Sequence, residues 1–321
     1  MLSRAEVETL IDWEDALTAV EESLVAHARG EARPFPTLRE AVPGGMVGVR
    51  GASWPKRGLL GVKVSGFFSG NRLNGLDSHQ GVIVLQDPDS GRPRALVDGN
   101  HVTWIRTAVA GVAGTRTLAR PDARRVLVVG NGLQAEAQVR SHAWGLAARS
   151  PEFEVHAPRD DAAGTKAGAF AARLERHGIH VKPAPDLEHA LAGADVVVTA
   201  TPSTDPVVSA AWVRAGTHIT AMGADAPGKR ELDDELVTRG RLVADERNQS
   251  LRFGEGQALG DVPAAALPTL GEVLAGATPG RTQPAEVTIF DSTGLGLHDV
   301  VTAEAAVRRA RERGAGVWIA L

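Results

Sequence analysis

The sequence of 321 residues contains no cysteine, which excludes disulfide bonds, thiolate metal sites and a cysteine nucleophile. No stretch approaches the run of about 18 apolar residues that a membrane-spanning helix needs, and the N-terminus lacks the apolar segment of a signal peptide. The net charge of −4 gives no reason to expect nucleic acid or an anionic membrane as a partner. We therefore expect a soluble cytoplasmic protein.

The chain is longer than a single hydrophobic core usually supports, so two domains are expected. Residues 5–29 have apolar positions at helical spacing, which predicts one amphipathic helix or a pair of them. Short β-type runs follow between residues 46 and 97, with a hairpin turn at 87–91 (DPDSG). Helical spacing returns at 101–120. This part of the chain is predicted to be α+β with an antiparallel sheet.

A different pattern begins near residue 121. Short apolar strands, with alanine-rich helical stretches between them, are predicted at 126–130, 153–157, 196–201, 218–224 and 241–245. That alternation is typical of a doubly wound parallel sheet. We expect a Rossmann-like α/β domain over 121–297, inserted into an α+β domain formed by 1–120 and 298–321. The last helix, predicted at 299–314, could pack on either domain.

A glycine turn follows the first predicted strand of the parallel sheet. Gly130, Gly132 and Ala135 form a G-x-G-x-x-A pattern that opens a helix. The first glycine permits a tight turn, the second lets the backbone approach a pyrophosphate, and the alanine keeps helix and strand close. The N-terminus of the helix then favours the phosphates. The pattern predicts a dinucleotide site, the alternative being a glycine turn without a ligand.

The choice between NAD and NADP is normally decided at the end of the second strand, where an acid binds the ribose of NAD. Here the strand FEVHA continues with Pro158, Arg159 and Asp160, so no carboxylate lies at its tip. Arg159 favours NADP over NAD. Alternatively Arg159 is a solvated loop residue, and Asp160 or Asp161 reaches the ribose.

Two charged residues lie at predicted apolar strands, one inside a strand and one directly after a strand. Lys63, one of only five lysines, lies inside the β-type run GVKVS, where alternation could also place it on a solvent face. Asp225 follows an apolar strand at the carboxyl edge of the parallel sheet, where ligands of doubly wound folds bind. The alternative for Asp225 is a helix cap.

Several segments, in their order and spacing over about residues 33–310, resemble the ornithine cyclodeaminase/mu-crystallin family. They are LLGVKVS (59–65), SHQGVIVLQDPDSGRPRALVDG (78–99), VTWIRTAVAG (102–111), VVGNGLQA (128–135), TATPST (199–204), GADAPGKREL (223–232) and FDSTG (290–294). The family includes cyclodeaminases, alanine dehydrogenases and ketimine or cyclic-imine reductases. The resemblance implies a homodimer formed through the non-Rossmann domain, which also binds the substrate.

The resemblance also implies roles for single residues. Lys63 matches the family's active-site lysine, and Asp225 matches the residue that transfers a proton at the substrate nitrogen. Arg106 is expected to bind the substrate carboxylate or the cofactor phosphates. Arg39 is a second candidate for the substrate carboxylate, with Arg50 as an alternative, because the surroundings of Arg39 (PFPTLREAVPGG) differ from those of typical members. Val49-Arg50-Gly51 stands where the family often has Met-Pro-Ala, a departure that bears on the choice of substrate.

The remaining residues that the resemblance implies lie on the cofactor side. Beyond Arg106, the glycine turn and Arg159, they are Thr103, Leu133, Gln134, Thr201, Pro202, Ser203, Gly223 and Ser292. His79 is expected to be a structural rather than a catalytic histidine. The histidines show no ligand spacing and no carboxylates cluster with them, so no metal is expected.

The expected activity is hydride transfer between NAD or NADP and Cα of a small α-imino or α-amino acid, as in an imine reductase or an amino-acid dehydrogenase. A cyclodeaminase would share the first step, trap the imine with a side-chain amine, release ammonia and regain its cofactor. A third possibility is a non-catalytic protein that binds NADP and a small ligand. Stoichiometric consumption of NAD(P)H distinguishes the reductase from the cyclodeaminase.

Overall fold

The computed structural model describes residues 1–160 and 164–319. Its chain forms two compact units, and each is described by itself. Unit 1 comprises Met1–Arg106 and Leu295–Leu321, and unit 2 comprises Thr107–Gly294. The first boundary falls inside a helix, α3 (Gly99–Leu118), rather than after residue 120, and the second falls just before the last helix. Unit 2 is therefore an insertion between two segments of unit 1.

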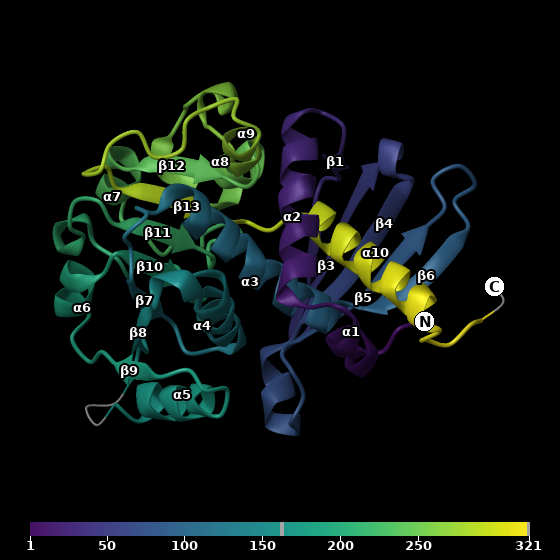
Figure 1. Cartoon of the computed structure of the whole chain (residues 1–321), viewed down its shortest axis with the longest axis horizontal. Coiled ribbons are helices and arrows are strands. Elements are labelled where there is room, and N and C mark those ends of the chain that lie inside the picture. The colour runs from purple at the N-terminus through teal and green to yellow at the C-terminus, as the bar shows by residue number, and fades with distance from the viewer. Residues whose placement is uncertain (161–163, 320–321) are drawn as a thin grey trace. The chain divides into compact units, whose positions relative to one another are not determined.

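Unit 1 is built around a six-stranded antiparallel sheet in the order β1-β3-β4-β5-β6, with β2 paired to β3 (Figure 1). The strands are β1 (Arg33–Pro34), β2 (Leu38–Val42), β3 (Gly45–Trp54), β4 (Leu59–Phe67), β5 (His79–Gln86) and β6 (Pro93–Asp98). The last helix, α10 (Gly296–Arg313), packs against β3, β4 and β5. The final helix thus joins the N-terminal part of the chain.

Two further helices precede the sheet. They occupy the region for which the sequence predicts either one amphipathic helix or a pair of helices. They are α1 (Arg4–Leu10) and α2 (Trp13–Ala28), and α2 packs against α10. Asp12 separates them because its side chain accepts a hydrogen bond from the Asp15 backbone N–H at 2.9 Å and so caps α2. Ser3 and Glu6 form a capping box that starts α1.

The two faces of β4 have different environments. Gly61 and Lys63 lie on the face that α10 covers. A Cβ on Gly61 would lie 3.1 Å from Val300 of α10, so this glycine allows the helix to approach. On the opposite face, β-sheet pairing aligns Leu38, Val49, Val64 and Val82 in a row across β2, β3, β4 and β5. Leu38 is 51% exposed, and Val64 and Val82 are each 41% exposed.

Unit 2 contains a seven-stranded parallel sheet in the order β12-β13-β11-β10-β7-β8-β9. The strands are β7 (Arg125–Val129), β8 (Glu152–His156), β9 (Val181–Pro183), β10 (Val196–Thr199), β11 (His218–Ala221), β12 (Arg241–Ala244) and β13 (Thr288–Asp291). Besides the larger part of α3, its helices are α4 (Leu133–Gly145), α5 (Thr165–Glu175), α6 (Leu187–Gly193), α7 (Asp234–Arg239), α8 (Arg247–Phe253) and α9 (Leu270–Leu274). The parallel, doubly wound sheet is confirmed.

The central strands of unit 2 are buried on both faces. Leu127 and Val129 of β7 belong to one hydrophobic cluster, whereas Val126 and Val128 belong to another. This explains why the strands are continuous apolar runs rather than alternating ones. Short 3-10 helices complete the chain: η1 (Pro55–Arg57), η2 (Ser69–Asn74), η3 (Ala147–Arg149), η4 (Ala210–Trp212), η5 (Glu255–Leu259) and η6 (Ala264–Ala266).

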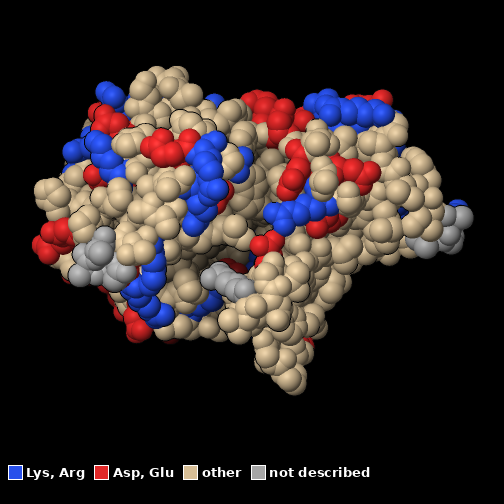
Figure 2. All heavy atoms as spheres, turned by 90° about the horizontal axis from the view of Figure 1, so that it is seen from below, with Lys and Arg blue, Asp and Glu red and all other residues tan. Residues whose placement is uncertain are grey.

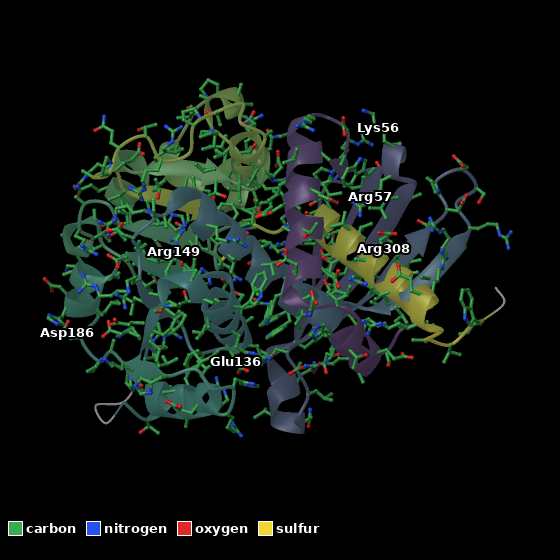
Figure 3. All side chains as sticks on the ribbon, viewed as in Figure 1. Lys56, Arg57, Glu136, Arg149, Asp186 and Arg308 are labelled. Atoms are coloured by element: carbon green, nitrogen blue, oxygen red, sulfur yellow. The ribbon has the colours of Figure 1, made fainter. Side chains whose placement is uncertain are left out.

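The surface carries charges of both signs, and Figure 2 shows lysine and arginine side chains lying among aspartate and glutamate side chains. Many form pairs within one unit. Glu136, in the first turn of α4 (Figure 3), lies 3.3 Å from Arg173 of α5. Arg57 of η1 pairs with Glu22 of α2 at 2.6 Å. Among the described residues, no helix has the length and apolarity to cross a membrane.

Candidate functional site

Unit 1 buries a compact ionic cluster beneath α10. Lys63 is 2% exposed, and its Nζ lies 2.8 Å from Oδ1 of Asp299, which is fully buried in the first turn of α10. Nε of Arg106, on α3, donates to the same Oδ1 at 2.9 Å. Lys63 also donates to the hydroxyl of Thr103 at 3.0 Å. Two buried cations therefore share one carboxylate oxygen, while Oδ2 of Asp299 has no hydrogen-bond partner among the described residues.

The cluster has an unusual electrostatic balance. Burial lowers the pKa of Lys63 to about 7, with the charges of Arg106 and Arg50 acting in the same direction and the Asp299 carboxylate opposing them. Burial alone would raise the pKa of Asp299, but Arg106 and Lys63 hold it well below its usual range. Asp299 is therefore an anion, and Lys63 can change its charge near neutral pH.

Strand register brings further residues to the same face. Arg50 of β3 lies directly opposite Lys63 of β4. Arg39 of β2 is half-buried and lies opposite Gly48, two residues before Arg50. The structure therefore brings together Lys63, Arg106 and Arg50, and places Arg39 on the adjoining strand.

His79, at the start of β5, feels the charges of this cluster. Burial, together with the positive charges of Lys63 and Arg106, lowers its pKa to about 4. A hydrogen bond with the Asn100 side chain acts in the opposite direction. His79 is thus a neutral polar neighbour of Lys63 at physiological pH.

In unit 2 the glycine turn has the geometry that a dinucleotide requires. Gly130 has φ of 128°, and a Cβ there would lie 2.6 Å from the carbonyl oxygen of Ala200. Gly132 is the N-cap of α4 and has no side chain to satisfy the first backbone N–H groups. A Cβ at Gly132 would meet no atom within 4 Å, so its backbone is open to a ligand. Ala135 is fully buried where the helix meets the sheet.

The two residues between Gly132 and Ala135 also face this end of α4. Leu133 is 54% exposed. Oε1 of Gln134 is buried and has no hydrogen-bond partner among the described residues. The residues present therefore fit a dinucleotide: open N–H groups for its phosphates and a polar side chain beside them.

Glu231 ties together the loops at the carboxyl edge of the parallel sheet. Its fully buried carboxylate accepts hydrogen bonds from the backbone and hydroxyl of Thr201 at 2.6 and 2.7 Å, from the hydroxyl of Thr199 at 2.6 Å, and from the backbone of Gly223 at 2.7 Å. Burial raises the pKa of Glu231, against the effect of these hydrogen bonds. A side chain at Gly223 would lie 2.2 Å from the Thr201 carbonyl oxygen, so glycine is required there.

Other residues expected near the nicotinamide lie in the same loops. Pro202 is exposed, and the Ser203 hydroxyl donates to the carbonyl oxygen of Asp205 at 2.7 Å. Ser292 is 4% exposed, and its hydroxyl lies 3.3 Å from the buried carboxylate of Asp245. Thr201, Ser203, Gly223 and Ser292 thus follow the ends of neighbouring strands. Thr103, by contrast, belongs to unit 1 and contacts Lys63.

Asp225 lies in the loop that Glu231 closes. Its Oδ1 accepts a hydrogen bond from Lys229 Nζ at 2.7 Å, and its backbone N–H donates to the carbonyl oxygen of Gly223 at 3.0 Å. The side chain is 40% exposed. Asp225 is thus a partly exposed carboxylate that forms an ion pair with Lys229 within its own loop.

The loop after β8 is the expected place for NADP discrimination. Arg159 is exposed and has a positive φ of 62°. Both oxygens of Asp160 accept backbone N–H bonds, from Lys166 and Ala167 at 2.8 Å each, so Asp160 stabilises the first turn of α5. Asp161 lies outside the described residues. The carboxylate of Asp160 is thus already engaged by the helix.

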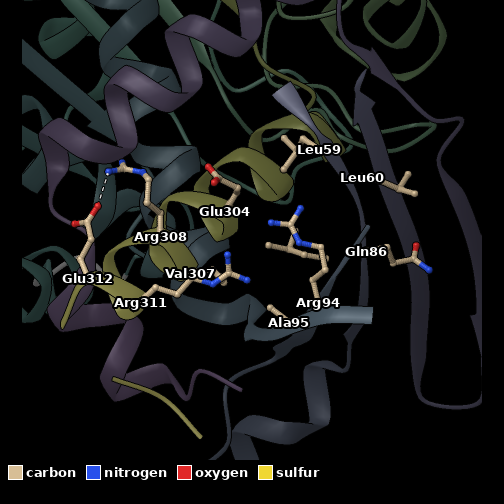
Figure 4. Close-up of a pocket in the computed structure, with 11 residues that line it drawn as sticks. Leu59, Leu60, Gln86, Arg94, Ala95, Glu304, Val307, Arg308, Arg311 and Glu312 are labelled. Carbon is tan, nitrogen blue, oxygen red and sulfur yellow. Dashed lines mark hydrogen bonds and ion pairs between the residues drawn. The ribbon is translucent and has the colours of Figure 1, made fainter. Parts of the chain in front are cut away.

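A cavity of about 220 Å³ in unit 1 is separate from these residues. It lies between α10 and strands β4, β5 and β6, and Figure 4 shows Leu59, Val307, Arg94 and Arg311 among its lining. Lys63, Arg106 and Asp299 do not line it. Among the described residues no group of three or more His, Cys, Asp or Glu side chains could hold a metal ion.

Asp299 and Glu231 were not predicted as site residues. Asp299 follows the start of a helix, where an acid is common because it interacts favourably with the helix dipole. Glu231 lies at the end of the GADAPGKREL segment, and only the fold shows that its side chain turns back to the start of the same loop.

A model of the ornithine cyclodeaminase/mu-crystallin family matches residues 1–314. The iminosuccinate reductase of Paracoccus denitrificans is 36% identical over 98% of this chain and 97% of its own length. An archaeal alanine dehydrogenase dimer with bound NAD has a TM-score of 0.90 and 34% identity, covering 99% of this chain and 98% of the other. The Δ1-pyrroline-2-carboxylate reductase of Thermococcus litoralis, in complex with NADH and L-proline, has a TM-score of 0.89 and 30% identity, covering 99% of each chain.

Proposed function

The chain belongs to the ornithine cyclodeaminase/mu-crystallin family, and we propose that it is an NAD(P)-dependent oxidoreductase that transfers hydride at the C–N bond of a small α-imino or α-amino acid. The observation that carries this proposal is the buried cluster of unit 1. Lys63 and Arg106 are two cations that one oxygen of Asp299 holds in place. Such a pair of fixed cations suits the carboxylate of an amino acid.

Unit 1 binds the substrate in this proposal. A guanidinium stays charged at any relevant pH and can donate two parallel hydrogen bonds to a carboxylate, which suits Arg106 and Arg39. The Lys63 ammonium adds a further donor. Because Asp299 fixes Lys63 and Arg106 before the substrate arrives, little side-chain ordering remains to be done on binding.

Asp225 handles the proton of the substrate nitrogen. Hydride can leave or reach Cα only while the nitrogen is in the appropriate protonation state, so a base near the nitrogen is needed in one direction and an acid in the other. Asp225 is a partly exposed carboxylate on a loop whose two ends Glu231 fixes. Lys229 Nζ, 2.7 Å away, donates a hydrogen bond to its Oδ1 and orients the carboxylate.

Unit 2 binds the dinucleotide, which supplies or accepts the hydride when bound. Gly130, Gly132, Leu133, Gln134 and Ala135 would hold its pyrophosphate. The loops that carry Thr201, Pro202, Ser203, Gly223 and Ser292 would hold its nicotinamide end. Relatives of known structure have NAD or NADH bound. We expect this chain to prefer NADP, because Arg159 is exposed after β8 and Asp160 is engaged in capping α5.

We also propose that the chain forms a homodimer through unit 1. The row Leu38, Val49, Val64 and Val82 presents apolar side chains on the sheet face opposite α10. Exposed apolar sheet surface of this kind usually marks an interface, and a similar solved structure is described as a dimer. Sedimentation velocity should give twice the chain mass, and Val64→Asp should give the monomer mass. A monomeric wild-type protein would contradict this proposal.

The experiment that tests the activity follows the absorbance of the reduced nicotinamide with 2-oxo acids plus ammonia or methylamine, with cyclic imines, and with ornithine or lysine. Lys63→Ala and Asp225→Asn should each abolish most turnover, whereas Lys182→Ala, at an exposed lysine of β9, should not. Stoichiometric use of NAD(P)H identifies an oxidoreductase, and turnover with catalytic amounts of cofactor identifies a cyclodeaminase. Full activity of both site variants would refute the assignment.

A further inference from the structure

A second cavity in unit 1 lies beside the cavity of about 220 Å³. Its volume is about 280 Å³, and we call it the tail cavity because it is formed by α10 together with residues 1–2, 92–96 and 315–319. The two cavities share Arg94 and Ala95 of β6 and Val307 and Arg311 of α10. The apolar row that includes Val64 lines neither cavity, so a homodimer formed through that row leaves the tail cavity open.

Backbone hydrogen bonds hold the wall of the tail cavity in place. The Val317 N–H donates to the carbonyl oxygen of Met1 at 3.1 Å, and the Met1 ammonium donates to the carbonyl oxygen of Val317 at 2.6 Å. Gly316 has φ of 93°, and a Cβ there would lie 2.9 Å from the Leu2 side chain. The Leu2 N–H donates to the carbonyl oxygen of Leu96 in β6 at 2.9 Å. The segment after α10 is therefore fixed against the N-terminus and β6.

The lining of the tail cavity is largely apolar and open to solvent. Val317, Trp318 and Ile319 are 63%, 77% and 54% exposed, respectively. Leu96 and Val307, which are half-buried, also line the cavity. Contiguous exposed apolar surface of this kind marks a binding site, because a ligand that covers it removes apolar area from water.

The charged side chains of the tail cavity are all positive. Arg92, Arg94 and Arg311 line it, and among the described residues no aspartate or glutamate does. Arg94 donates to the carbonyl oxygen of Gly58 at 3.2 Å. The side chains of Arg92 and Arg311 form no hydrogen bond or ion pair with any residue that the structure describes. In Figure 4 the side chains of Arg94 and Arg311 extend from β6 and α10 toward each other.

The acids of the neighbouring cavity do not neutralise these arginines. Two glutamates line that cavity, and each is paired elsewhere. Glu312 lies 3.4 Å from Arg308, and Glu304 lies 3.8 Å from Arg57. An apolar wall beside arginines that lack a carboxylate partner is complementary to a ligand with an apolar body and one anionic end.

We propose that the tail cavity binds an aliphatic carboxylate of about eight to ten carbons, whose carboxylate lies between Arg94 and Arg311 and whose chain covers the apolar wall. A guanidinium matches a carboxylate bidentately. At the roughly 30 Å³ that a water-sized group occupies, a volume of about 280 Å³ holds about nine heavy atoms. Lys63, Arg106 and Asp299 line neither cavity, so this site is distinct from the ionic cluster and does not depend on the proposed activity.

The test measures the Kd of decanoate for the full chain by titration calorimetry, below the concentration at which decanoate forms micelles. Affinity should fall by about two- to fourfold for each methylene removed from decanoate to hexanoate, because each buried methylene contributes to binding. Decylammonium has the same chain with the opposite charge and should bind at least about tenfold more weakly. Equal Kd values for decanoate and decylammonium would overturn the proposal, because apolar contact alone would then explain the binding.

Variants locate the ligand on the molecule. Arg94→Gln and Arg311→Gln should each raise the Kd of decanoate by about tenfold. Arg313→Gln removes a positive charge from the same helix outside both cavities, so this matched control should change the Kd by less than about twofold. Decanoate should alter the tryptophan emission of the wild type but not that of Trp318→Phe. Lys63→Ala should leave the Kd of decanoate unchanged.

Three results would overturn the proposal. The first is a Kd that neither Arg94→Gln nor Arg311→Gln changes. The second is a large loss of affinity in Lys63→Ala, which would place decanoate in the ionic cluster. The third is no binding of decanoate at all; if Val307→Asp then lowers the mass found by sedimentation velocity, a second copy of the chain covers the tail cavity instead. Both arginines are exposed, so a urea midpoint equal to that of the wild type should confirm that their variants fold.

Discussion

Replacing Asp299 by asparagine should remove most of the stability that the ionic cluster contributes to unit 1. The substitution preserves shape but leaves Lys63 and Arg106, which lie 2.8 and 2.9 Å from the same oxygen, without a counter-charge in a buried site. Removing one partner of a buried ion pair costs about 3–5 kcal/mol, because the remaining charge stays desolvated. With an m-value of about 2 kcal/mol/M, the urea midpoint of unit 1 should fall by roughly 2 M.

The loss should depend on pH in a direction that the structure fixes. Without Asp299 the folded-state pKa of Lys63, already lowered to about 7, falls further below its unfolded value of about 10.4. Between those two pKa values the unfolded chain binds more protons, so stability rises with pH. The free energy of unfolding that the variant loses relative to wild type should therefore be larger at about pH 6 than at about pH 9. At about pH 9 Lys63 is largely neutral in both proteins, and the substitution leaves the charge of Arg106 uncompensated.

Hydrogen exchange of the β4 amides measures the opening of unit 1 separately from unit 2. The matched control is Asp77→Asn, which removes an exposed ion pair with Arg4 and should cost less than about 1 kcal/mol. A loss for Asp299→Asn below about 1 kcal/mol, or one that is the same at both pH values, would refute the view that Asp299 compensates two buried cations.

Three further predictions concern the reaction. The KM for the substrate should rise as pH increases through about 7, because Lys63 loses its charge there. Lys63→Arg should remove this pH dependence. A wild-type KM that stays constant into the alkaline range would contradict the prediction. Glu231→Gln replaces one acceptor oxygen by an N–H₂ group, which then faces the donors of Thr199, Thr201 and Gly223. The Kd for the dinucleotide, measured by nicotinamide fluorescence, should therefore rise by about tenfold or more. An unchanged Kd would show that these loops do not position the cofactor. Arg159→Ala should raise the KM for NADPH by about tenfold and leave the KM for NADH within about twofold, because only NADPH has a 2′-phosphate that Arg159 can bind. Equal changes in the two KM values would show that Arg159 has no part in cofactor choice.

The strands with strong apolar patterns were predictable, and the weak ones were not. The runs at 126–130 and 196–201 became β7 and β10 because both faces of each strand are buried. β2 (Leu38–Val42) was not predicted, since LREAV has no regular alternation and β2 lies beside β3, outside the main order of the sheet. β9 (Val181–Pro183) has three residues, one of them proline, and lies at the edge of its sheet, where proline is tolerated.

The candidate site was predictable where a local motif carries the chemistry. The glycine turn at 130–135 needs only a strand before it and a helix after it, and both are local features. The partner of Lys63, in contrast, lies more than 200 residues away in Asp299. In the sequence, Asp299 looks like an ordinary acid in the first turn of a helix. Only the packing of α10 on the antiparallel sheet shows that Asp299 and Lys63 are in contact.

β4 is a strand whose alternate residues serve separate purposes. Lys63 points to α10 and the ionic cluster, while its neighbours Val62 and Val64 point to the opposite, apolar face. Substitutions on the face of the ionic cluster can therefore accumulate at every second position without altering the apolar face, and the reverse is also true. A single-residue insertion before Lys63 would exchange the two sets at once, placing the ammonium at an apolar surface and a valine among the arginines. We expect the length of this segment to tolerate far less change than its composition.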